Sequence, residues 1–174
     1  QLIIDDKEEQ AILLLLWQSE HALTESAENE ALWKAAQLAS LRSENNDQAV
    51  ALLKRCVERP NFTHLADAYA RLASLVAEPM PRTAAEYWQQ AIQSNPDHVM
   101  VAKWWINVAN TYEMIGDEHR AIDAWEQVMA YDESISLARI SLGRLQLNTD
   151  PDLALQHFYT LKGHAAEGKT ATLG

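Results

Sequence analysis

Small and large apolar residues recur along the chain in a pattern that predicts repeated helical hairpins. Four alanines are each followed, four residues later, by a large apolar residue. These pairs are Ala49 with Leu53, Ala84 with Trp88, Ala121 with Trp125, and Ala154 with Phe158. Residues one turn apart share a helix face, so the small residue allows close approach of a second helix while the large one fills the adjacent gap. The alanines are spaced by 35, 37 and 33 residues, which predicts two-helix units that stack on one another.

Turn-forming residues divide each expected unit into two helices. The breaks within the units fall at 44–47, 78–81, 116–117 and 148–151. Pro60 and Pro96 end the first two units, because proline cannot continue the helical hydrogen-bond ladder. We therefore expect about four hairpins over residues 30–162.

The segments outside the hairpins are predicted to differ from each other. Residues 1–29 are expected to hold one helix from about 6 to 24, with a polar connector at 24–29. Its apolar stripe through Leu13, Leu16 and Trp17 is wide, which predicts burial on two sides. Ala11 and Leu15 repeat the small–large spacing, so this helix is also readable as half of a preceding repeat. Residues 163–174 are expected to form a flexible tail.

The third unit resembles the tetratricopeptide repeat, whose signature is W-x2-L-G-x2-Y, then A-x3-F, then P. Its sequence runs Trp105-x2-Val108-Ala109-x2-Tyr112, then Gly116, then Ala121-x3-Trp125. The other units depart further from the signature, and the first is the most degenerate. The resemblance implies an all-α right-handed superhelix of antiparallel helical hairpins. It also implies that the opening helices line a concave groove where peptides commonly bind.

Polar residues at groove positions of the opening helices are the candidate binding residues. The register places five bases and two acids there, in a chain with 14 basic and 25 acidic residues. The bases are Lys34, Arg42, Arg71, Lys103 and Arg144, the acids are Asp67 and Glu113, and the amides Asn107 and Asn110 lie among them. From these we predict a peptide-binding set of Lys34, Arg71, Lys103, Asn107, Asn110 and Arg144. A basic stripe attracts an acidic segment or a C-terminal carboxylate. The alternative is that these positions are ordinary solvated faces.

The heat-shock carboxylate clamp found in some co-chaperones of this repeat type is not expected here. Lys34 and Lys103 match two of its basic positions, but Leu38, Arg71 and Asn107 depart from the others.

Four tryptophans occupy packing positions of the repeat and are predicted to lie in the core: Trp33, Trp88, Trp105 and Trp125. Trp104 must point elsewhere on its helix, because it is adjacent to Trp105. We interpret Trp104 either as a contact residue for a partner or as buried against a neighbouring hairpin.

Composition and short motifs limit which partners, metals and reactions are expected. A net charge of −11 disfavours nucleic acid and anionic membrane surfaces as partners. The single cysteine, Cys56, excludes an internal disulfide and lies in an apolar helical pattern, so a buried thiol is expected. The six histidines show no metal-ligand spacing, and no nucleophile motif is present. The match to G-x4-G-K-[ST] from Gly163 to Thr170 lacks the preceding strand that a phosphate loop needs. We therefore predict no catalytic residue, metal or cofactor.

The leading hypothesis is a non-enzymatic adaptor that binds a protein or peptide in the groove and helps to assemble a complex. A regulatory or targeting module of a larger enzyme is one alternative, and a structural spacer that self-associates is another. The longest apolar run, residues 11–17, is too short to span a bilayer. Loose repeats with frequent Gln and Asn suit a bacterial protein, and both cytoplasm and periplasm remain open as its location.

Overall fold

The chain folds as a series of α-helices. The computed structural model describes the backbone of residues 2–41 and 46–171, and the side chains of 7–41 and 46–162. In these ranges the helices are α1 (Leu2–Glu20), α2 (Glu25–Ser40), α3 (Asn46–Val57), α4 (Leu65–Val76), α5 (Pro81–Ser94), α6 (Val101–Met114), α7 (Glu118–Tyr131), α8 (Ser136–Gln146) and α9 (Pro151–Ala171). The described backbone contains no β-strand, which confirms the all-α prediction.

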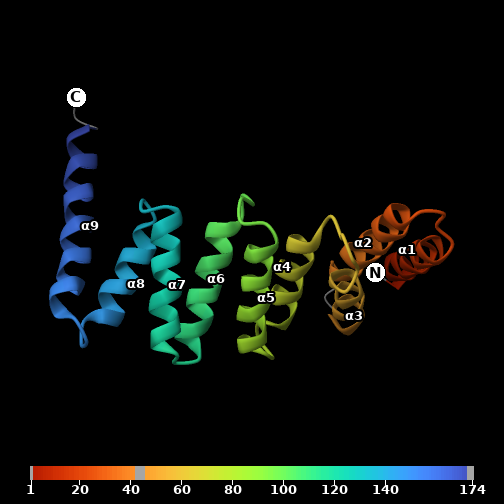
Figure 1. Cartoon of the computed structure of the whole chain (residues 1–174), viewed down its shortest axis with the longest axis horizontal. Coiled ribbons are helices and arrows are strands. Elements are labelled where there is room, and N and C mark those ends of the chain that lie inside the picture. The colour runs from red at the N-terminus through yellow and green to blue at the C-terminus, as the bar shows by residue number, and fades with distance from the viewer. Residues whose placement is uncertain (1, 42–45, 172–174) are drawn as a thin grey trace. The chain divides into compact units, whose positions relative to one another are not determined.

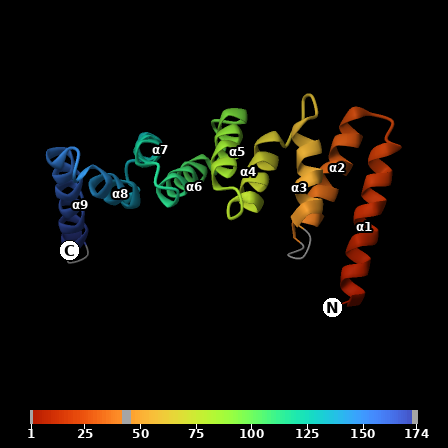
Figure 2. The same cartoon turned by 90° about the horizontal axis from the view of Figure 1, so that it is seen from below.

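Two compact units divide the chain, the first at Gln1–Pro96 and the second at Asp97–Gly174. In the first unit α1 packs on α2, α2 on α3, α3 on α4, and α4 on α5. In the second unit α6 packs on α7, α7 on α8, and α8 on α9. Within each unit, helices adjacent in sequence lie side by side in both views (Figures 1 and 2). The four predicted hairpins correspond to α2 with α3, α4 with α5, α6 with α7, and α8 with α9.

The small–large pairs form the interior of the hairpins, as predicted. All four alanines of the pattern are fully buried, and their large partners Leu53, Trp88 and Trp125 are at most 6% exposed. Phe158 is the exception at 38% exposed, and its ring lies over Gly143 of α8. A Cβ added to Gly143 would lie 2.7 Å from the Phe158 ring, so glycine is what allows α9 to approach α8 this closely.

The turn at Gly116 shows how local chemistry ends a helix. Gly116 has a φ of +74°, a conformation that glycine adopts without steric cost. Its N–H donates to the Glu113 carbonyl, and the N–H of Asp117 donates to the Tyr112 carbonyl at 2.9 Å. These two bonds form a Schellman motif, which satisfies the last carbonyls of α6. Asp117 then caps α7 by accepting a hydrogen bond from the Arg120 N–H, so α6 and α7 form a tight hairpin.

The start of α2 corrects the predicted connector at 24–29. The structure begins α2 at Glu25, and Thr24 is its N-cap residue. The Thr24 hydroxyl accepts a hydrogen bond from the Ala27 N–H at 3.2 Å, which satisfies one of the free donors at the helix start. The connector between α1 and α2 is therefore residues 21–24. A Thr followed by acidic residues is a capping signal that the polar composition concealed.

The buried face of α1 is also different from the predicted stripe. Ile12 is fully buried and Ser19 is 3% exposed, whereas Leu13 and Trp17 are 58% and 56% exposed. In the described side chains, α1 buries only the face turned toward α2, so the prediction of burial on two sides is wrong. Residues 11–17 are apolar on every side of the helix, so the sequence does not show which face packs against α2. The interpretation of α1 as half of a preceding repeat stays a prediction.

The C-terminal segment is helical where a tail was expected. Helix α9 continues through Ala171, so the predicted tail at 163–174 is wrong for 163–171, and 172–174 lie outside the described residues. Alanines in this stretch favour the helix and offset its two glycines. The G-x4-G-K-[ST] match lies within this helix and not in a loop between a strand and a helix.

Candidate functional site

The six predicted binding residues fall into two groups, one in each unit. Lys34 lies on α2 and Arg71 on α4, in the first unit. The second unit holds the rest, with Lys103, Asn107 and Asn110 on α6 and Arg144 on α8. Arg42, which the same register placed in the groove, lies outside the described residues.

The three residues of α6 form one row, which we call the α6 stripe (Lys103, Asn107 and Asn110). Their spacing of four and three residues places them on the same helix face. Lys103 and Asn110 are exposed, and Asn107 is partly exposed. None of the three side chains has a hydrogen-bond or ion-pair partner in the described part of the chain. The stripe thus presents one ammonium group and two amides to solvent.

Beside the α6 stripe, Glu113 joins three helices. Its Oε1 accepts a hydrogen bond from the Trp125 Nε1 of α7 at 2.6 Å. Its Oε2 accepts a hydrogen bond from the Arg144 guanidinium of α8, which is also an ion pair. Trp125 is fully buried, so Glu113 satisfies an indole N–H that has no access to water. The charge of Arg144 is consequently balanced within the protein.

In the first unit, the other two predicted residues belong to what we call the Trp33 cluster (Glu30, Trp33, Lys34, His64 and Arg71). The His64 ring stacks on Trp33, with centroids 5.2 Å apart and an interplanar angle of 11°. The guanidinium carbon of Arg71 lies 5.8 Å from the Trp33 ring centroid, within the range of a cation–π contact. Glu30 pairs with Lys34 at 3.2 Å and with His64 at 3.5 Å.

Ion pairs in the Trp33 cluster balance part of the positive charge that the sequence predicted for the groove. The hydrogen bond from Lys34 is the main cause that lowers the pKa of Glu30, and His64 contributes in the same direction. Lys34 and Arg144 are thus both neutralised by nearby carboxylates, and the Arg71 guanidinium lies over the Trp33 ring. Of the predicted bases in the described chain, Lys103 alone has no such contact. Lys103 is therefore the predicted base of the described chain that is left without an ion pair or a ring contact, and the binding role of the predicted set stays a prediction.

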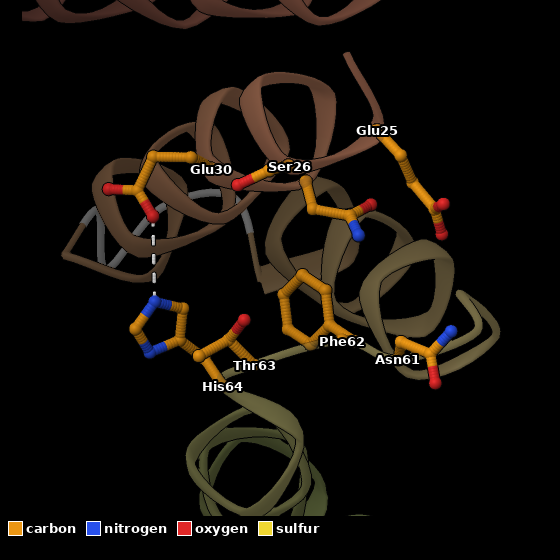
Figure 3. Close-up of a pocket in the computed structure, with 8 residues that line it drawn as sticks. Glu25, Ser26, Glu30, Asn61, Phe62, Thr63 and His64 are labelled. Carbon is orange, nitrogen blue, oxygen red and sulfur yellow. Dashed lines mark ion pairs between the residues drawn. The ribbon is translucent and has the colours of Figure 1, made fainter.

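A cleft of about 410 Å³ lies next to the Trp33 cluster, between the first turns of α2 and residues 61–64. We call it the α2 cleft. Figure 3 shows Glu25 and Asn61 toward one end, Glu30 and His64 toward the other, and Phe62 between them. Asn61 has a φ of +53°, a left-handed conformation that Asn tolerates better than most residues. The sequence marked Pro60 as the end of the first unit but gave no sign of the cleft.

The tryptophans follow the predicted core pattern with one exchange. Trp33, Trp88 and Trp125 are at most 6% exposed, as predicted. Trp104, one interpretation of which was a contact residue, is 4% exposed and stacks on His98 at a centroid distance of 4.6 Å. Burial of Trp104 is therefore the correct alternative. Trp105, predicted to lie in the core, remains partly exposed.

Cys56 has the environment of an unreactive thiol. It is fully buried, and burial raises the pKa of its thiol to about 12, although Arg55 and Arg59 act against that shift. Such a thiol is almost entirely protonated at neutral pH, and the thiolate is the nucleophile. The prediction of a buried thiol is confirmed.

The described residues contain no group of three or more His, Cys, Asp or Glu side chains arranged to hold a metal ion. In the same part of the chain, every helix is too short or too polar to cross a membrane.

Solved structures with the same arrangement of helices identify the fold. The chain is similar to the crystal structure of MamA, with a TM-score of 0.63 and 20% sequence identity, covering 95% of this chain and 94% of that one. A second MamA crystal structure has a TM-score of 0.61 and 18% identity, with coverages of 92% and 96%. A crystal structure from Podosopora anserina, described as the nearly identical TPR-like repeats of a kinesin light chain, has a TM-score of 0.61 and 17% identity, with coverages of 95% and 90%.

These similarities show a tetratricopeptide-type fold, as the sequence predicted, and at such identities they show the fold alone. In sequence, the chain matches no family model and no curated protein.

Proposed function

We propose that the chain is a protein-binding module that captures a protein or peptide segment on the exposed face of α6, helps to assemble a complex and catalyses no reaction itself. One observation carries the proposal. The α6 stripe presents three polar side chains in a row, and none is used inside the described part of the protein. Repeat folds bury one side of each helix and leave the other for partners.

The chemistry of the α6 stripe suits an extended peptide. An asparagine amide both donates and accepts, so Asn107 and Asn110 have the groups needed to pair with a peptide backbone. From Lys103 to Asn110 the stripe runs about 10 Å along the helix axis, which matches about three residues of extended chain. The Lys103 ammonium at one end suits an acidic side chain or a C-terminal carboxylate.

The experiment is affinity capture from lysate, with variants chosen from the observed contacts. Lys103→Glu reverses the one predicted base that has no partner in the described residues. Arg144→Glu is unsuitable, because it would place a second carboxylate beside Glu113 and disturb the fold. The matched control is Lys162→Glu, which makes the same charge change at an exposed position of α9.

A partner held by the wild type and by Lys162→Glu but lost by Lys103→Glu supports the proposal. A partner held equally by all three proteins contradicts the role of the α6 stripe. Recovery of no partner by any of them contradicts the adaptor itself.

A second candidate function, a self-associating spacer, is favoured by the exposed apolar side chains of α1. Leu13, Leu14 and Trp17 are 56–58% exposed on adjacent turns of this helix. Single exposed apolar residues are ordinary, but several together mark an interaction surface. The spacer predicts a sedimentation coefficient that rises with concentration and a Trp17→Ser variant that stays monomeric. A monomer at all concentrations contradicts it.

A further inference from the structure

The α2 cleft is lined by a residue, Asn29, whose side-chain amide oxygen is buried and unpaired in the described part of the chain. The cleft is lined by Glu25, Ser26, Asn29, Glu30, Asn61, Phe62, Thr63 and His64. Asn29 is 9% exposed, and its Oδ1 is buried with no hydrogen-bond partner among the described residues. Buried polar atoms are nearly always paired, because leaving one unpaired destabilises the fold. An N–H donor brought into the cleft next to Asn29 would provide the missing partner.

The charge of the lining favours a cation over an anion. Glu25 is exposed and its carboxylate has no partner among the described residues. Glu30 is already held by Lys34 and His64, so Glu25 is the free carboxylate of the cleft. None of the described residues that line the cleft is a lysine or an arginine. The N-terminus of α2 adds only about half a positive charge, which is less than the full negative charge of Glu25.

An apolar surface separates the two ends of the cleft. Figure 3 shows the Phe62 ring between Glu25 and Asn61 at one end and Glu30 and His64 at the other. Phe62 packs edge-on against Trp33 at a centroid distance of 6.1 Å, which fixes its ring. A ligand that enters the cleft therefore meets a rigid apolar wall as well as the acceptors.

We propose that the α2 cleft binds a guanidinium group, the end of an arginine side chain from a partner protein. A guanidinium is planar and has five N–H donors and no acceptor. One edge is suited to donate two parallel bonds to the Glu25 carboxylate, while a remaining N–H reaches the Asn29 Oδ1. The methylene stem packs on Phe62. This site lies in the first unit and does not depend on the α6 stripe.

The test uses the whole chain and two small probes, N-acetyl-arginine amide and N-acetyl-citrulline amide. Citrulline has nearly the same shape, but its terminal group is neutral. Titration to millimolar concentrations is followed by NMR through the side-chain amide of Asn29 and the backbone amides of Asn61 and Thr63. The arginine probe should shift all three signals to saturation, and the citrulline probe should not.

Two variants assign the effect to the cleft. Glu25→Gln removes the free carboxylate and should weaken binding of the arginine probe about threefold, as expected for an exposed ion pair. Glu86→Gln removes the same charge at an exposed position of α5 outside the cleft, and should leave binding unchanged. Equal shifts with both probes, no shift of the Asn29 amide, or equal affinity in Glu25→Gln would each overturn the proposal.

Discussion

Replacement of Glu113 should separate two contributions to the stability of the second unit. The Trp125 indole N–H donates to Glu113 at 2.6 Å and is fully buried. Leaving such a donor unpaired costs about 1–3 kcal/mol. The ion pair with Arg144 is worth less, about 0–1 kcal/mol, because the Arg144 side chain is 57% exposed and solvent screens its charge.

Three variants distinguish these contributions. Glu113→Gln keeps an acceptor oxygen for Trp125 and loses only the ion pair, so it should cost less than about 1 kcal/mol. Arg144→Ala should cost a similar amount. Glu113→Leu removes both interactions and should cost the sum of the two contributions, about 1–4 kcal/mol. The free energy of unfolding is measured by urea denaturation, followed by far-UV circular dichroism.

Comparison requires the same dependence on urea in every variant, because a changed slope would mean a changed unfolded state or a loss of cooperativity. The reasoning would be refuted if Glu113→Leu were no less stable than Glu113→Gln. That result would mean that the Trp125 N–H finds another partner or is reached by water.

Three further predictions concern other parts of the chain. Ala121→Glu should unfold the second unit, because Ala121 is fully buried where α7 meets its neighbours and the new carboxylate would be buried without a partner. A folded variant with an unchanged circular dichroism spectrum would contradict the packing. Cys56 should resist iodoacetamide at pH 8 in the native protein and react after addition of denaturant, since burial raises the pKa of its thiol to about 12. Labelling is measured by mass spectrometry, and rapid labelling of the native protein would refute this prediction. Burial lowers the pKa of His157 below its ordinary value of 6.5, and Arg139 acts in the same direction against the weaker opposing effect of Glu126. The unfolded state then binds the proton more readily, so the His157 contribution is intact above about pH 6.5 and is lost as pH falls below it. The melting temperature of wild type should therefore fall more steeply with acidification than that of His157→Gln, and parallel curves would exclude the effect.

The sequence predicted the hairpins because their packing rests on local patterns. Ala121 and Trp125 are one turn apart, and both are fully buried. Gly116 marks a turn that needs a left-handed residue. The face of α1 was mispredicted because residues 11–17 are apolar on every side, so periodicity cannot select the buried face. Only packing against α2 decides that Ile12 is inside and Leu13 outside.

Less of the candidate site than of the fold could be predicted from the sequence, because the pairing of charged side chains depends on tertiary contacts. Spacing along α6 was enough to place Lys103, Asn107 and Asn110 on one face. The pairing of Arg144 with Glu113, 31 residues apart, could not be read from spacing. The α2 cleft is made by two segments more than 30 residues apart in sequence, and nothing local announces it.

The binding role of the α6 stripe is tested most directly by lysine footprinting with the captured partner. An amine-reactive reagent is applied to the chain alone and to the complex, and the modification of each lysine is measured by mass spectrometry. Lys54 on α3 is the internal control, because it is exposed and lies in the other unit. The proposed function predicts that the partner protects Lys103 and leaves Lys54 unchanged. Equal modification of Lys103 with and without the partner would contradict it.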